Sequence, residues 1–288
     1  MSALARASLS ALRRRRTPDP EADRRAMLAL VRSTGARGGR IDPHRSIATI
    51  DLAPHDMLLA ACLSLAFLVV FVAGLELLGA LWTGIFGALA EPLGLAGGVA
   101  HRVSTVAGAI QIAIPYFVAR APLPGATAWW VTLVVTAIVL IGTLFMRGAW
   151  LPLSYALRFA VAIQASALLF FGLVPARFPH DLQGYVSAMM LVGAAIIGVV
   201  PVVLGATFYL MDVGWNRKVA LTLLMMGHLV VLVPLQYALQ AAVIVHASLI
   251  VMPLCFLLFG VLPEIMVIVA LFGWGMSWES LRARGRRQ

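Results

Sequence analysis

The stretch MLLAACLSLAFLVVFVAGLELL, residues 57–78, decides the fold class. Its first 19 residues, from Met57 to Leu75, carry no charged side chain, and Glu76 is the first acid. An α-helix rises about 1.5 Å per residue, so about 20 apolar residues cross the roughly 30 Å hydrocarbon layer of a bilayer. The stretch therefore predicts a transmembrane helix.

Five further segments have the same character. In chain order the six predicted spans are Met57 to about Leu78, Ala128 to Met146, Leu153 to Val174, Tyr185 to Leu210, Val219 to Tyr237, and Ala241 to Phe272. The chain has 288 residues, of which 61% are apolar and 12% charged. Soluble domains hold about 45–50% apolar and about 25% charged residues. We therefore predict an all-α integral membrane protein, a polytopic helical bundle.

The segment from Leu81 to Ala119 is ambiguous, because Glu91, Pro92 and Arg102 interrupt its apolar residues. It could be re-entrant, interfacial or two further spans, which gives six or, alternatively, eight transmembrane helices. Basic residues in short loops stay in the cytoplasm. With six spans, eight basic residues outside the N-terminal tail lie on the cytoplasmic side and three on the other. Both numbers of spans are even, so both termini lie on the same side of the membrane. The count of basic residues indicates that this side is the cytoplasm.

Much of the positive charge gathers at the two ends of the chain. Residues 1–56 hold 11 arginines and six acids, residues 279–288 hold four arginines, and the net charge is +10. We interpret 1–56 as a basic, largely disordered cytoplasmic tail, 57–278 as the transmembrane helical domain and 279–288 as a second basic tail. A basic tail beside a bilayer attracts anionic lipid. No predicted domain could present a basic face to nucleic acid, so none is expected as a partner.

Polar side chains within the spans are the first candidates for function, because the bilayer makes them costly. They are Glu76, Glu264, His228, His246, Gln111, Gln164 and Gln236. A hairpin turn near Gln240 would bring Glu264 level with Arg217 and Lys218, so we expect an ion pair there, with a proton relay or a cation site as the alternatives. Glu76 is expected at the outer interface. The glutamines are expected to join helices by hydrogen bonds, or to line a conduction path.

The histidines are the candidates for metal or haem. His228 follows Met225-Met226-Gly227 and is the one candidate metal ligand, with core packing as the alternative. The same expected turn places His228 and His246 about 9 Å apart in depth, which disfavours a bis-histidine haem. Cys62 and Cys255 are too far apart in sequence to form a CxxC pair. No cofactor is predicted.

The predicted outer loop brings Arg177, His180 and Asp181 close together in sequence. A histidine beside an aspartate can serve acid–base chemistry, so these three residues are the candidate catalytic cluster. A charged, solvated turn is the alternative. The chain carries no GxSxG, HExxH or phosphate-loop motif, which leaves the cluster without a recognisable nucleophile or metal site.

Small residues and prolines complete the sequence evidence. Gly193, Gly198 and Gly205 line one predicted span, which indicates a central, closely packed helix. Prolines within other spans, such as Pro234 and Pro263, remove a backbone donor and require a neighbour to satisfy the freed carbonyl.

Three functional hypotheses remain. The first is a permease-like or export-complex membrane subunit of a bacterial inner membrane, without its own catalytic domain. The bacterial source is suggested by 21 arginines against one lysine. The second is a non-catalytic membrane scaffold or assembly factor that binds other membrane or cytoplasmic subunits. The third is a membrane-embedded enzyme acting on a lipid-linked substrate.

Overall fold

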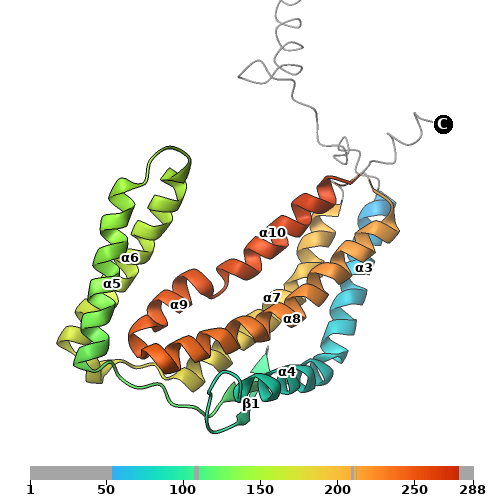
Figure 1. Cartoon of the computed structure of the whole chain (residues 1–288). Coiled ribbons are helices and arrows are strands. Elements are labelled where there is room, and N and C mark those ends of the chain that lie inside the picture. The colour runs from blue at the N-terminus through green and yellow to red at the C-terminus, as the bar shows by residue number, and fades with distance from the viewer. Residues whose placement is uncertain (1–53, 107–109, 209–210, 212, 279–288) are drawn as a thin grey trace, which may run out of the picture.

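The computed structural model describes residues 54–106, 110–208, 211 and 213–278 (Figure 1). It is an all-α polytopic membrane protein with a small two-stranded sheet. Within these residues, six helical stretches are long and apolar enough to cross a membrane: Pro54–Ala73, Ala126–Phe145, Gly148–Leu173, Leu182–Thr207, Trp215–Ala247 and Leu249–Met276. The two tails predicted to be basic lie outside the described residues, apart from residues 54–56 of the N-terminal tail.

The ambiguous segment forms neither one nor two additional spans. Helix α4 (Leu75–Ala90) runs across the end of α3 (Pro54–Ala73), and strands β1 (Val99–Val106) and β2 (Ile110–Phe117) form an antiparallel hairpin (Figure 1). Eight residues per strand and 16 in α4 are short of the length needed to cross hydrocarbon. The hairpin packs on α4 and on α7 (Leu182–Thr207). This segment therefore adds no span. The described residues contain six spans, and the eight-span alternative is wrong.

Helix α7 is the centre of the bundle, as the small residues predicted. A side chain at Gly193 would strike Val233 of α8, and one at Gly198 would strike Phe71 of α3. Gly205 lies equally close to Ser64 of α3. These approaches bring α7 into contact with both neighbours along its length, which buries more of it than of any other span among the described residues.

Helix α8 (Trp215–Ala247) is longer than expected. We expected a hairpin turn near Gln240, and this was wrong: α8 continues to Ala247 and the turn lies at Ser248, where φ is 103°. The chain then returns through the short 3₁₀-helix η4 (Leu249–Val251), α9 (Met252–Phe259) and α10 (Leu262–Met276). The returning span is thus broken into two helices.

Pro234 lies inside α8 and cannot donate a hydrogen bond to the carbonyl of Val230, four residues earlier. The indole Nε1–H of Trp82 on α4 donates to that oxygen at 2.8 Å. Trp82 is fully buried. The freed carbonyl therefore finds its partner on another helix, which is the condition for proline inside a membrane helix.

Helices α5 (Ala126–Phe145) and α6 (Leu151–Leu173) form a hairpin that stands apart from α7, α8 and α10 at the end where α5 joins α6 (Figure 1). The hairpin is held together in part by Arg158, which donates to the hydroxyl and carbonyl oxygens of Thr143, each at 3.2 Å. Its contacts with the rest of the bundle run mainly from α6 to α9 and η4. The start of α3 and the end of α10 lie at the same end of the molecule, as an even number of spans requires (Figure 1).

Candidate functional site

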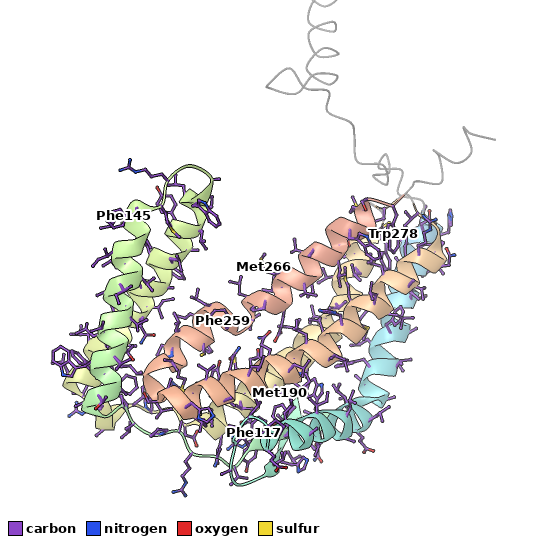
Figure 2. The ribbon with its side chains drawn as sticks, viewed as in Figure 1. Phe117, Phe145, Met190, Phe259, Met266 and Trp278 are labelled. Carbon is purple, nitrogen blue, oxygen red and sulfur yellow. The ribbon has the colours of Figure 1, made fainter. Side chains whose placement is uncertain are left out.

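The break between α9 and α10 has a local cause in the sequence. Pro263 has no N–H, so the carbonyl of Phe259, four residues earlier, has no helical donor. Gly260 stands at the break itself with ψ at −110°, and a side chain there would collide with the carbonyl oxygen of Phe256. A glycine followed by a proline three residues later therefore interrupts the span directly after Phe259 (Figure 2).

Two glutamines of α8 satisfy the carbonyls left free by the break. The Nε2 group of Gln236 donates to the oxygen of Phe259 at 2.8 Å and to that of Gly260 at 2.5 Å. The Nε2 group of Gln240 also donates to Phe259. Residues four apart share one face of a helix, so both amides point to the same place. The spacing of the glutamines thus matches the break that they cap.

The polar contacts continue to α7. The hydroxyl of Tyr185 donates to Oε1 of Gln240, whose Nε2 group holds Phe259. Tyr185 and Gln240 are both buried. A row of hydrogen bonds therefore crosses the bundle from α7, through α8, to the broken span.

Glu264 lies in the first turn of α10 and is fully buried, with 0% of its surface exposed. Its Oε1 accepts a hydrogen bond from the hydroxyl of Tyr237 on α8 at 2.8 Å. Its Oε2 is buried and has no hydrogen-bond partner. Tyr237 directly follows Gln236 on α8, so Glu264 lies beside the glutamines at the break.

The ion pair that we expected for Glu264 is wrong. Its partner Tyr237 lies 19 residues beyond Lys218 on α8, which is about 28 Å of helix. The error follows from the displaced turn, because moving it from Gln240 to Ser248 changes which residues of the two spans face each other. Lys218 donates instead to the carbonyl of Phe208 at 2.8 Å.

The depth of the site follows from its position on α8. Tyr237 is 11 residues before the turn at Ser248, which corresponds to about 16 Å of helix. This is about half the thickness of the hydrocarbon layer. Glu264, which Tyr237 contacts, lies 16 residues beyond the same turn in the returning span. The cluster is thus deep within the spanning part of the bundle.

Buried oxygen atoms on α6, on α8 and at the turn after α8 lack partners as well. Oε1 of Gln236 has none, although its Nε2 group is fully used. On α6, Gln164 donates through Nε2 to the carbonyl of Ile250 at 3.1 Å, while its Oε1 has no partner. The hydroxyl of Ser248 at the turn is also unpartnered. The amide and carboxylate atoms left over are all acceptors.

The predicted catalytic cluster makes separate contacts. Asp181 is the N-cap of α7, and its carboxylate accepts from the backbone N–H of Gly184 at 3.0 Å. The ring of His180 packs edge-on against Phe178, with centroids 5.6 Å apart. Arg177 ends a short 3₁₀ turn and its side chain is exposed. The carboxylate of Asp181 is thus engaged in capping α7.

Both histidine candidates lie on α8, 18 residues or about 27 Å apart along the helix, so they cannot face one haem iron. His228 is exposed on the bundle surface, and Nε2 of His246 lies 3.0 Å from the carbonyl oxygen of Leu93. In residues 54–278, outside the gaps at 107–109, 209–210 and 212, no three His, Cys, Asp or Glu side chains gather as metal ligands do.

The remaining predicted residues lie outside the cluster. Glu76 is exposed in the first turn of α4, beside the bend that follows α3. Gln111 is exposed on β2. No family model matches the chain, and no curated protein or solved structure matches it.

Sequence reasoning passed over Tyr237 and Tyr185, which carry no charge and read as ordinary aromatic residues of a span. One pattern could have indicated them. Gln236, Tyr237 and Gln240 place three hydrogen-bonding side chains within five residues of a membrane helix. Hydrogen-bonding groups so concentrated need partners within the bundle, and Gly260 with Pro263 supplies free carbonyls for them.

Proposed function

We propose that this chain is a permease-like transport protein of a bacterial inner membrane, alone or as the membrane subunit of an export complex. The solute or its coupling ion binds at the break between α9 and α10. The observation that carries the proposal is Glu264, which is fully buried with one carboxylate oxygen unpartnered. An ionisable side chain inside a bilayer is costly and marks ion or substrate pathways.

The geometry of the break supports the same proposal. Secondary transporters commonly bind substrates and ions near the middle of the bilayer, where a discontinuous helix leaves backbone groups and helix ends available. Here the break lies beside a carboxylate whose partner, Tyr237, is about 16 Å of helix from the turn at Ser248. A purely structural span has no need of this break at that depth, since Pro263 removes a helical hydrogen bond and Gly260 turns the backbone out of the helical path.

A transport site must open to water, and this gives a test that needs no known substrate. In a chain with Cys62→Ser and Cys255→Ala, we place a cysteine at Leu262, which is 47% exposed and two residues from Glu264. The matched control is a cysteine at Val135 on α5, which is 53% exposed. A charged, membrane-impermeant thiol reagent is expected to label Leu262→Cys from one side of the membrane and Val135→Cys from neither. Absence of labelling at Leu262→Cys from both sides would contradict the proposal.

A second experiment seeks the solute. The purified chain in proteoliposomes is exposed to amino acids, sugars, nucleosides and inorganic ions while transient currents are recorded. Currents are expected with at least one class, and Glu264→Gln is expected to abolish them. Glu76→Gln is the matched control, because Glu76 is exposed at the start of α4 and is expected to leave the currents unchanged. Currents that survive Glu264→Gln would move the site elsewhere.

The proposal includes the orientation of the chain in the membrane. The count of basic residues in the loops favours both termini in the cytoplasm. Reporter fusions at residues 150, 215 and 288 are expected to read cytoplasmic, and a fusion at 180 periplasmic. An external reading at 288 would overturn this topology. Co-purification of the full chain with an ATPase would favour the export-complex form of the proposal.

The other two hypotheses have less support. The scaffold depends on a basic tail that lies mostly outside the described residues. The enzyme depends on Arg177, His180 and Asp181, and the aspartate is engaged as the cap of α7. If cells carrying His180→Ala process lipid-linked substrates as well as cells carrying the unchanged chain, the enzyme hypothesis would be contradicted.

A further inference from the structure

The carboxyl group of Glu264 has no positively charged partner in the part of the chain that the structure describes. It is fully buried, and its Oε1 accepts from the neutral hydroxyl of Tyr237 while Oε2 has no partner. Among residues 54–278 that the structure describes, none forms an ion pair with it. An ionised carboxylate is poorly tolerated in an apolar interior unless a cation compensates it. Glu264 therefore needs either a proton or a bound cation.

The titratable side chain that contacts Glu264 is the neutral Tyr237 on α8. Tyr185 on α7 lies near Tyr237, and Cys255 on α9 lies near Tyr185, so the neighbouring elements add no positive charge at this point. The nearest ionisable groups along α8 are His228 and His246, each nine residues from Tyr237, which is about 13 Å of helix. The compensating charge must therefore come from solution.

The oxygen atoms available are too few for a metal cation. Hard cations such as Mg²⁺ and Ca²⁺ require six or so oxygen ligands. The carbonyls of Phe259 and Gly260 already accept from glutamine amides, whose N–H groups repel a cation. Oε2 of Glu264 and Oε1 of Gln236 are the unpartnered oxygens at the break. One proton satisfies Oε2, whereas a metal would remain underligated.

We propose that Glu264 is a proton-binding residue, which takes up a proton at Oε2 and makes transport through this protein proton-coupled. The inference rests on the proposed function, of which it names the coupling ion. The position of Glu264 in the first turn of α10 suits such exchange, because the positive end of a helix dipole stabilises the carboxylate once the proton leaves.

Dicyclohexylcarbodiimide tests the protonated form directly. The carboxylic acid adds across a C=N bond of the reagent: its oxygen bonds to the central carbon and its proton passes to nitrogen. The acyl group then shifts to nitrogen and leaves a stable N-acylurea. No oxidant or leaving group takes part, and an ionised carboxylate does not react in this way. The apolar reagent enters the bilayer, and mass spectrometry of the digested full-length protein locates the adduct.

We expect an adduct at Glu264 that forms rapidly in mildly acidic buffer and falls by about tenfold or more in alkaline buffer. Glu264→Gln, checked for folding by size-exclusion chromatography, is expected to lose this adduct. Exposed Glu76 and Glu91 serve as internal controls and are expected to react little at the same pH. An adduct on these two acids but not on Glu264 would overturn the proposal.

Sodium and choline chloride distinguish the proton from a metal cation. A proton-binding site reacts at equal rates in both salts. Protection of Glu264 by sodium alone, or by magnesium or calcium, would overturn the proposal in favour of a metal-cation site. The reaction does not depend on transport. Normal labelling of Glu264 without transient currents would therefore contradict the proposed transport function but not proton binding by Glu264. Currents without labelling would contradict proton binding but not transport.

Discussion

Gln240 is the residue whose replacement most directly tests the network around the broken span. It is 6% exposed, and it accepts from the Tyr185 hydroxyl and donates to the Phe259 carbonyl. In Gln240→Met, which preserves volume, the Phe259 carbonyl keeps Gln236 as donor, but the Tyr185 hydroxyl has no partner. A buried polar group without a partner costs about 1–3 kcal/mol. Interhelical hydrogen bonds in membranes average about 0.6 kcal/mol, with a maximum near 1.7.

We therefore expect Gln240→Met and Tyr185→Phe each to lower the free energy of unfolding by about 1–2 kcal/mol. The double variant has no orphaned hydroxyl, so its loss is expected to be smaller than the sum of the two single losses by about 1 kcal/mol. Unfolding by SDS in mixed micelles, followed by fluorescence of the seven tryptophans, measures all three values.

Gln183→Met is the matched control. Gln183 also donates to a backbone carbonyl, that of Val118 at 3.1 Å, but it does so at the exposed surface, and its loss is expected to stay within about 0.5 kcal/mol. Additive losses in the double variant, within about 0.3 kcal/mol, would show that the hydrogen bond between Tyr185 and Gln240 does not form in the folded protein. The cap on the α9–α10 break would then lack its link to α7.

Three further predictions concern other parts of the bundle. Trp82→Phe should lower the unfolding free energy by about 1–3 kcal/mol, and Pro234→Ala in the same chain should recover part of it by restoring the helical N–H, as the same SDS titration measures. Asp181→Ala removes the cap of α7 and should cost about 1 kcal/mol in that titration; no loss would mean that the cap is dispensable. Exchanging charges, Glu264→Lys with Lys218→Glu, should not restore the protein level lost in Glu264→Lys, measured by immunoblot, because the two side chains lie at different depths; recovery would revive the ion pair.

The six long spans could be predicted because hydrophobic length is a property of each segment alone, whereas the interrupted segment from Leu81 to Ala119 left eight spans open. Stretches such as Met57–Leu78 are long, apolar and free of interior charge, so local composition suffices. The boundary between the last two spans could not be read in this way. Gln236 and Gln240 look like the polar residues of a turn, but their amides are satisfied by carbonyls of another helix. These hydrogen bonds depend on how the helices pack, which the local sequence does not show. They allow α8 to continue past both glutamines to the turn at Ser248.

The β-hairpin was missed for a related reason. Its second strand contains Ile112, Ile114 and Phe117, which are buried, but the run is too short to distinguish a strand from part of a helix by periodicity. Gly97 and Gly98, both with positive φ, precede the first strand and were the available signal for a sharp change of direction. The sequence therefore showed that the apolar pattern is interrupted, but it did not show that a β-hairpin forms there.

The candidate site was predictable in part. Glu264 stands out in any reading, because an acid in an apolar span is rare. Its partner was not predictable, since which residue of α8 faces it depends on where the preceding turn lies. Tyr237 carries no charge, and only the packing of α10 against α8 gives it a role.

The capping of the broken span by α8 decides how this molecule can change shape. Pulling α9 and α10 away from α8 would leave the carbonyls of Phe259 and Gly260 bare in hydrocarbon, where each unsatisfied group costs several kcal/mol. Helices α8, α9 and α10 must therefore move as one rigid body. Among the described residues no side-chain hydrogen bond joins α6 to α9, whereas Gln164 of α6 donates to the carbonyl of Ile250 in η4. A hinge in this protein is therefore expected beside η4, and the α5–α6 hairpin is the part that swings.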